Sequence, residues 1–123
     1  MIVVESSAMV NALVGTPANP ELLALLADEQ LHAPALLDFE VAGALRGHVM
    51  GGKLDPVQLD DAVEDFIALR IERHSMTGLL GHMLDLRESF TVYGAAYLVL
   101  AQALEVPVVS ADVKLREATR AGP

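Results

Sequence analysis

The 123-residue sequence has no cysteine, few basic residues and no apolar run long enough to cross a membrane. Without cysteine the chain has no disulfide and no zinc–thiolate site, which fits a reducing compartment. The apolar stretch after Gly94 is interrupted by Gln102, Glu105 and Pro107 before the roughly 18 residues of a membrane span accumulate. The opening stretch MIVVESSAMV has no basic segment, which predicts that it is not a signal peptide. We therefore expect a cytoplasmic protein with no membrane partner.

Basic residues are scarce: 8 Lys and Arg stand against 17 Asp and Glu, for a formal charge of −9. A protein that coats DNA needs clustered cations to neutralise phosphates, so this charge has the wrong sign for that class. Two classes stay open. One is an enzyme that holds nucleic acid through metal ions in an acidic pocket, and the other is a protein with a basic partner. Solubility alone also explains an acidic surface.

Hydrophobic residues make up 53% of the chain, which is too apolar for a disordered protein. The length suits one domain with a single sizeable core, and no repeat or linker interrupts it. We therefore expect residues 1–123 to form one domain.

Short apolar strands alternate with helices along the chain, a pattern typical of an α/β sandwich with a parallel sheet. Gly15 to Pro20 predicts a break between the first two helices. The expected strands are Ile2–Val4, Leu31–Ala33, Ile71–His74 and Val106–Ser110. The expected helices run from Ser6 or Ser7 to Val14, Glu21 to Glu29, Ala35 to Met50 with Pro34 in the first turn, Pro56 to Leu69 capped by Asp55, Met76 to Arg87, Thr91 to Leu104, and onward from Val113.

Two acids come just after the two best strands. Glu5 follows IVV and Asp112 follows VPVVSA. In parallel sheets, ligands bind outside the carboxyl ends of strands, so these carboxylates share one crevice if the strands are near neighbours. Acids are disfavoured directly after a buried strand, which favours a function for Glu5. Asp112 has an equally good structural explanation as the N-cap of the last helix.

The helix after Pro34 offers a third acid. Asp38 and Glu40 flank opposite edges of its apolar stripe at similar angles, so periodicity does not choose between them. Carboxylates that converge repel one another unless a cation joins them, and hard divalent cations such as Mg²⁺ prefer oxygen ligands. A bound Mg²⁺ or Mn²⁺ would activate water and orient a phosphodiester.

The helix that Thr91 caps has an unusual start. A capping box places an acid at the third helical position, where a carboxylate faces free N–H groups and the positive end of the helix dipole. This chain has Gly94 there, a poor helix former without a side chain.

Three blocks of the sequence together resemble PIN-domain ribonucleases of the VapC toxin type. They are MIVVESSAMV, LHAPALLDFEVAGALR and LRESFTVYGAAYLVLAQALEVPVVSADVKL. The resemblance implies a three-layer α/β/α sandwich with a central parallel sheet, Mg²⁺- or Mn²⁺-dependent RNA cleavage, a homodimer and a cognate VapB-type antitoxin as partner.

The resemblance also implies the site residues. The family pattern has an acid at four positions, which Glu5, Glu40, Gly94 and Asp112 occupy here, so Glu40 is preferred to Asp38. Asp is expected at the positions of Glu5 and Gly94. A carboxylate moved by roughly 1 Å can cost about 10²-fold in rate, and Gly94 removes a ligand outright. We therefore expect weak or absent cleavage, with a PIN module that binds an antitoxin or dimerises without cutting as the alternative.

Four further residues are candidates beside the acids. Ser7 and Ser110 could orient metal-bound water or simply cap turns. Lys114 and Arg116 could contact RNA phosphates or be ordinary surface cations. The four histidines show no HxxxH spacing, so no histidine metal site is predicted. A receiver-like signalling domain is disfavoured, since it would need an acid pair after the first strand.

Overall fold

Four parallel strands form one sheet in the computed structural model, which describes residues 1–15 and 20–121. The strand order is β3-β2-β1-β4. The first strand of the chain is therefore central in the sheet, and the last strand lies beside it at the edge. Their bounds are β1 Ile2–Val4, β2 Leu31–Pro34, β3 Ile71–His74 and β4 Val108–Val109. Because all four run the same way, their carboxyl ends meet at one edge of the sheet.

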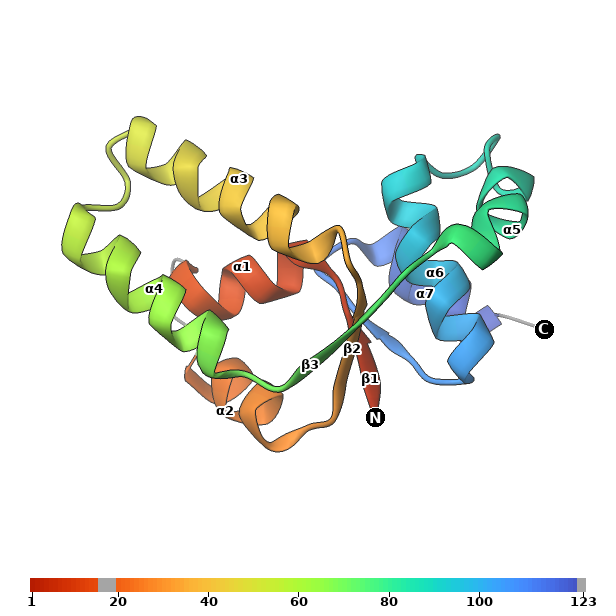
Figure 1. Cartoon of the computed structure of the whole chain (residues 1–123), viewed down its shortest axis with the longest axis horizontal. Coiled ribbons are helices and arrows are strands. Elements are labelled where there is room, and N and C mark those ends of the chain that lie inside the picture. Colours follow the sequence, from red (N-terminus) through yellow and green to blue (C-terminus); the bar gives the residue numbers. More distant parts are fainter. Residues whose placement is uncertain (16–19, 122–123) are drawn as a thin grey trace.

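Helices cover both faces of the sheet and form the outer layers of an α/β/α sandwich (Figure 1). Helices α1 to α4 lie on one side, with α1 in contact with the other three, and α5 to α7 lie on the other side around α6. Their bounds are α1 Ser6–Val14, α2 Pro20–Asp28, α3 Leu37–Met50, α4 Pro56–Ala68, α5 Leu80–Asp85 after the 3-10 turn Thr77–Leu79, α6 Val92–Leu104 and α7 Val113–Ala121. This architecture confirms the expected fold class.

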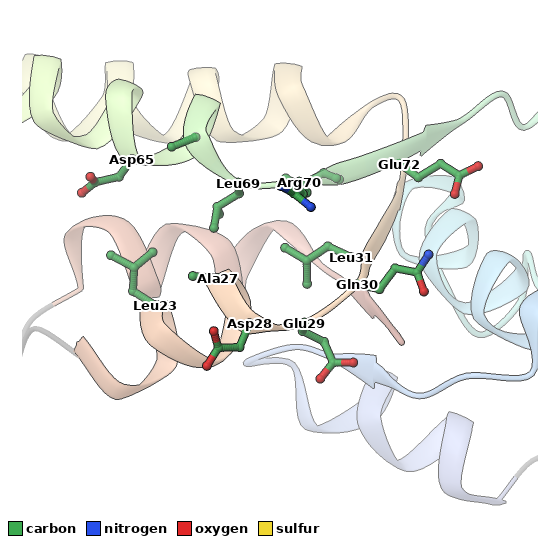
Figure 2. Close-up of a pocket in the computed structure, with 12 residues that line it drawn as sticks. Leu23, Ala27, Asp28, Glu29, Gln30, Leu31, Asp65, Leu69, Arg70 and Glu72 are labelled. Carbon is green, nitrogen blue, oxygen red and sulfur yellow. The ribbon is translucent and has the colours of Figure 1, made fainter.

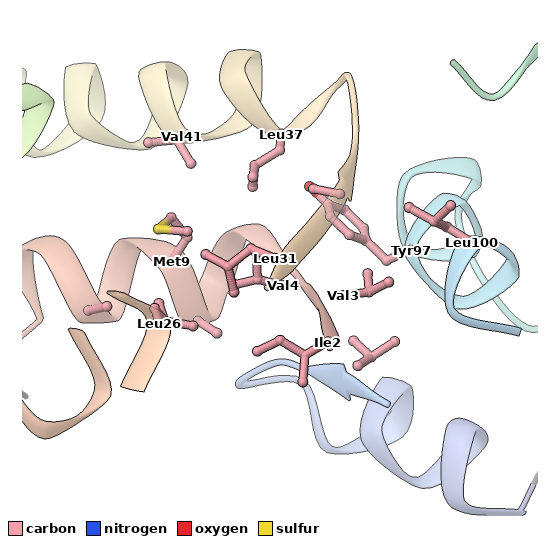
Figure 3. Packing of buried hydrophobic residues seen from close by; sticks show 14 of the residues in the cluster. Ile2, Val3, Val4, Met9, Leu26, Leu31, Leu37, Val41, Tyr97 and Leu100 are labelled. Atoms are coloured by element: carbon pink, nitrogen blue, oxygen red, sulfur yellow. The ribbon is translucent and has the colours of Figure 1, made fainter. Parts of the chain in front are cut away.

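The core lies on both faces of the sheet because successive strand residues point to opposite sides. Val3 points toward Tyr97 and Leu100 of α6, whereas Val4 points toward α1 and α3 (Figure 3). Tyr97 is 1% exposed and is among the largest fully buried side chains. The α6 layer thus brings a polar hydroxyl into an otherwise apolar core.

Local differences from the sequence-based prediction occur where elements begin or end. Helix α1 is capped by Glu5, not by a serine, because the Glu5 side chain accepts the N–H of Ser7. Pro34 ends β2 instead of starting a helix, and α3 begins only at Leu37. Strand β4 is limited to two residues, and the predicted break lies mostly outside the described residues. The predicted caps of α4 by Asp55 and of α6 by Thr91 are confirmed.

None of the helices in residues 1–15 and 20–121 is both long and apolar enough to cross a membrane.

Candidate acidic site at the carboxyl edge of the sheet

Glu5 leaves β1 at the carboxyl edge and is tied there by its backbone and its side chain. Its N–H donates to Val109 O of β4 at 2.9 Å. Its carboxylate accepts hydrogen bonds from Ser6 Oγ at 2.8 Å, Ser7 N at 3.1 Å and Ser110 Oγ at 2.6 Å. It also accepts one from Ser7 Oγ. Glu5 is therefore held by several donors from two segments that lie 105 residues apart in sequence.

Ser110 connects the Glu5 carboxylate to the segment that carries Asp112. Its side chain is 5% exposed, and its Oγ accepts the Asp112 N–H at 2.9 Å while donating to Glu5. The Ala111 N–H donates to Ser7 Oγ at 3.0 Å. Because β1 and β4 are neighbours, the structure thus brings the Asp112 backbone next to the Ser110 hydroxyl that contacts Glu5. The Asp112 carboxylate itself accepts the Lys114 N–H at 3.0 Å, so it also caps α7.

Glu40 of α3 reaches the same edge through Tyr97 of α6. The Tyr97 hydroxyl donates a hydrogen bond to Glu40 Oε1. Burial raises the pKa of Tyr97 above its usual value, and the Glu40 carboxylate raises it further, with Glu5 contributing in the same direction. Both glutamates therefore lie near one phenol that stays protonated and donates.

Asp38, which periodicity could not separate from Glu40, lies elsewhere. Its carboxylate receives two N–H groups of Arg73 on β3, at 3.0 Å and 2.8 Å, in a two-pronged ion pair. The tertiary structure therefore assigns the two acids to different contacts: Asp38 pairs with the edge strand and Glu40 meets Tyr97.

Replacing Tyr97 by Phe should lower the free energy of unfolding by about 1.5–3 kcal/mol, because the Glu40 carboxylate loses a charge-assisted hydrogen bond. Urea denaturation measures this loss. The matched control is Tyr93→Phe, since Tyr93 is 61% exposed, and it should change stability by less than about 0.5 kcal/mol.

The Tyr97 effect also depends on pH. A pKa that folding raises contributes stability below the unfolded value of about 10, and this stability is lost as pH rises through the folded value. The difference between parent and Tyr97→Phe should therefore shrink above about pH 10. A difference that is constant with pH, or equal losses in both phenylalanine variants, would contradict the assigned contact.

Gly94 has space for a side chain. A Cβ placed there would meet Thr91 Oγ1 at 3.6 Å, with Leu115 and Phe90 carbons at 3.9 Å, which are ordinary contacts. The residue lies within α6, and its N–H donates to Thr91 Oγ1 at 3.2 Å. Tyr97 comes three residues later, on the same face of the helix. Neither close packing nor backbone conformation therefore requires glycine here.

Glu5 and Glu40 both act on Tyr97, and the Asp112 backbone is linked to Glu5 through Ser110, but the three carboxylates do not form a tight set. Among the residues that the structure describes, one group of three or more potential ligand side chains has all its ligand atoms within 4.8 Å of one another. That group is His32, Glu72 and His74, which the sequence analysis missed. The sequence held one signal for this group: Glu72 and His74 are two positions apart in a predicted strand, so their side chains point to the same face. The Tyr97 contact to Glu40 was also missed, because helical periodicity does not show which polar group a buried hydroxyl contacts.

The two candidate RNA-binding cations follow the acidic site on α7. Lys114 Nζ donates to the Ser89 carbonyl and lies 4.6 Å from the centre of the Phe90 ring. Its ammonium therefore contacts the two residues that precede Thr91, the N-cap of α6. Arg116 is exposed, and its backbone N–H donates to Asp112 O at 3.2 Å.

The donor set at this edge suits a hard cation. Glu5, Glu40 and Asp112 offer carboxylate oxygens, and Ser7 and Ser110 offer hydroxyls, with neither imidazole nor sulfur among them. Mg²⁺ and Mn²⁺ are bound by one or two carboxylates and keep several water molecules as further ligands. The three acids can supply those carboxylates. The residues present therefore fit one such ion.

A pocket of about 940 Å³ lies at the opposite end of the sheet (Figure 2). It is formed where α2 leads into β2 and α4 leads into β3, and it is lined by residues such as Ala27, Gln30, Leu69 and Arg70. These residues precede their strands, whereas Glu5 and Asp112 follow theirs. The acidic site therefore does not lie in this pocket.

No family model matches the chain, but curated relatives do. A VapC ribonuclease of Mycobacterium bovis is 32% identical over 121 residues, which cover 98% of this chain and 93% of the relative. Ribonuclease VapC12 of Mycobacterium tuberculosis is 33% identical over 95% of this chain and 91% of its own length. Ribonuclease VapC1 of the same species is 36% identical, with 94% and 89% covered. Together with the parallel α/β/α sandwich, these similarities over nearly full length show that the chain belongs to the VapC family of PIN-domain ribonuclease toxins.

Proposed function

We propose that residues 1–123 form one domain that acts as a VapC-type endoribonuclease with an incomplete acidic site, so that RNA cleavage is weak or lost. Glu5, Glu40 and Asp112 would hold Mg²⁺ or Mn²⁺, and Gly94 occupies the position of a missing fourth ligand. The observation that carries this proposal is the hydrogen-bonded connection between Glu5, Ser110 and the Asp112 backbone at the carboxyl edge of β1 and β4.

The chain's own residues have distinct roles in this proposal. Tyr97 positions the Glu40 carboxylate by a hydrogen bond from a phenol that keeps its proton. Ser7 and Ser110 hold Glu5 and would orient water beside it. A divalent cation held by Glu5, Glu40 and Asp112 would supply an activated water and a charge that stabilises the in-line displacement at phosphorus. RNA cleavage then requires the phosphodiester to lie at the carboxyl edge.

Two features support weak activity. Glu5 carries its carboxylate one methylene farther out than the expected Asp, and its two oxygens already accept hydrogen bonds from three hydroxyls. Ligation must therefore displace or share these bonds. At Gly94, no carboxylate is available, which disfavours an arrangement with two metal ions.

The family supports further partners for this chain. We propose RNA as the substrate, a VapB-type antitoxin as the inhibitor, a cytoplasmic location and a homodimer. Large apolar side chains that are exposed support the dimer, among them Phe39 at 81%, Ile67 at 73% and Met50 at 72%. For RNA phosphates, Lys114 and Arg116 are the proposed contacts, and Lys114 would have to leave Ser89 to make one.

Cleavage of single-stranded RNA by the purified chain tests this function. We expect slow cleavage that needs Mn²⁺ or Mg²⁺ and stops when a chelator is added. Glu40→Gln and Asp112→Asn should remove it. The matched control is Asp38→Asn, because Asp38 lies on the same helix but pairs with Arg73, and this variant should cleave like the parent.

The results separate the two candidate functions. Cleavage that survives both Glu40→Gln and Asp112→Asn would refute the proposed site. If the parent and all variants are inactive and the parent still captures a VapB-type antitoxin, the inactive binding module is the correct function. The observation that favours this inactive binding module is the missing side chain at Gly94.

A further inference from the structure

Three potential metal ligands come together on strands β2 and β3, away from the acidic site. His32 pairs with Glu72 in the register of the two strands, and Pro34 pairs with His74. Residues 72 and 74 are two positions apart in β3, so their side chains point to the same face of the sheet, and both lie beside the His32 ring. That face is the one covered by α6, because Val3, the neighbour of His32 in the register of β1, also points there (Figure 3).

The ligand atoms are spaced for one small ion. His32 Nδ1 lies 2.9 Å from His74 Nε2 and 3.5 Å from Glu72 Oε2, and one ligand atom from each of the three residues lies within 4.8 Å of the other two. A tetrahedral zinc with bonds of about 2.0–2.1 Å separates its ligands by roughly 3.3–3.4 Å. The two observed distances bracket that value. Small rotations of the side chains would therefore complete three corners of a tetrahedron.

The cluster joins a buried member to an exposed one. His32 is 4% exposed, and its Nδ1 is the ring nitrogen that faces both His74 and Glu72. Its Nε2 points away from them and has no hydrogen-bond partner among the described residues, and a metal bound at Nδ1 would not change that. Glu72, by contrast, has a side chain that is 63% exposed, so an ion can reach the group from solvent.

We propose that His32, Glu72 and His74 bind a borderline transition-metal ion, best represented by Zn²⁺, and leave one position to water. Two imidazoles and one carboxylate are a set that zinc accepts, whereas Mg²⁺ favours oxygen ligands throughout. The ion would fasten the edge strand β3 to β2. This site shares no residue with the acidic site, and its metal preference differs.

The competing explanation is a metal-free cluster. At 2.9 Å the two imidazoles can share one proton in a hydrogen bond, and Glu72 can pair with a protonated His32. Their rings are tilted by 38° with centres 5.1 Å apart, which permits either arrangement. Metal binding to the purified protein separates the two.

Calorimetric titration of the chelator-treated full chain with Zn²⁺ tests the proposal, and the visible spectrum with Co²⁺ reports the coordination geometry. We expect one equivalent of each ion and a tetrahedral cobalt spectrum. Removing an outer partner of a metal ligand typically costs about 10–100-fold in affinity, so loss of a ligand should cost at least that in Glu72→Gln and more in His74→Gln. The matched control is His82→Gln, an exposed histidine on α5, which should bind like the parent.

The outcome is independent of RNA cleavage. The double variant Glu40→Gln/Asp112→Asn should keep Zn²⁺ binding, and Mg²⁺ should not displace Zn²⁺. Absence of binding, displacement by Mg²⁺, or equal affinity in Glu72→Gln and the parent would overturn the proposal. Because Glu72 is exposed, its variant is expected to fold, and circular dichroism verifies this.

Discussion

The Gly94→Asp variant is expected to bind Mn²⁺ more tightly and to cleave RNA faster than the parent. The new carboxylate occupies open space near the start of α6, where the nearest contact to a Cβ is 3.6 Å away. Without metal, stability should change little, because a gain in helix propensity and a dipole interaction of about 0.3–1 kcal/mol opposes repulsion from the other acids. With metal, repulsion becomes ligation. At a Mn²⁺ concentration of 100 times the dissociation constant, the stabilisation is about 2.7 kcal/mol.

Adding Glu5→Asp to Gly94→Asp should give the largest gain in cleavage. Shortening residue 5 withdraws the carboxylate by roughly 1 Å, a displacement that can be worth about 10²-fold in rate. Thermal unfolding with and without Mn²⁺ and an RNA cleavage assay measure the two effects. Gly94→Asn is the matched control, because it fills the same space without the charge and should gain neither. If the double variant gains neither Mn²⁺ affinity nor cleavage, Gly94 is not a vacated ligand position.

Glu5→Ala is expected to destabilise the fold by about 2–3 kcal/mol even without metal. The Glu5 carboxylate caps α1 by accepting the Ser7 N–H, and loss of such a cap costs about 0.5–2 kcal/mol. The buried Ser110 hydroxyl also loses its acceptor, and an unsatisfied buried group costs about 1–3 kcal/mol. Chemical denaturation measures the sum.

A comparison with Asp112→Ala separates the cost of losing a helix cap from the cost of leaving the Ser110 hydroxyl without its acceptor. Asp112 caps α7 through the Lys114 N–H, so its removal should cost only about 1 kcal/mol. Glu5→Gln keeps one acceptor oxygen and should fall between the two. If Glu5→Ala were instead more stable than the parent, repulsion between Glu5 and Glu40 would outweigh the hydrogen bonds that hold Glu5.

The sequence predicted the fold because its signals were local and mutually consistent. Short apolar strands alternated with capped helices, and only a parallel sheet covered on both faces accommodates that order. The same reasoning placed Glu5 and Asp112 at one edge on the condition that β1 and β4 are neighbours, and the strand order meets that condition. Periodicity alone did not separate Asp38 from Glu40, because both lie at edges of the same apolar stripe.

The tertiary structure decided which groups these side chains contact. Arg73 comes from β3 and Tyr97 from α6, and these partners give Asp38 and Glu40 different surroundings. The cap of α1 also depends on the tertiary structure. Glu5 accepts hydrogen bonds both from Ser7 in its own helix and from Ser110, which follows β4.

The cluster of His32, Glu72 and His74 shows the limit most clearly. Its members come from two strands that α3 and α4 separate in the chain, and nothing in their spacing brings position 32 to position 74. The sequence by itself determined the order of elements, the family and the edge of the sheet where acids collect, because periodicity, caps and strand direction are local properties. Only the tertiary structure decided the contacts of Glu40, the space at Gly94 and the meeting of the two histidines, because strand register and helix packing join residues that are far apart in sequence.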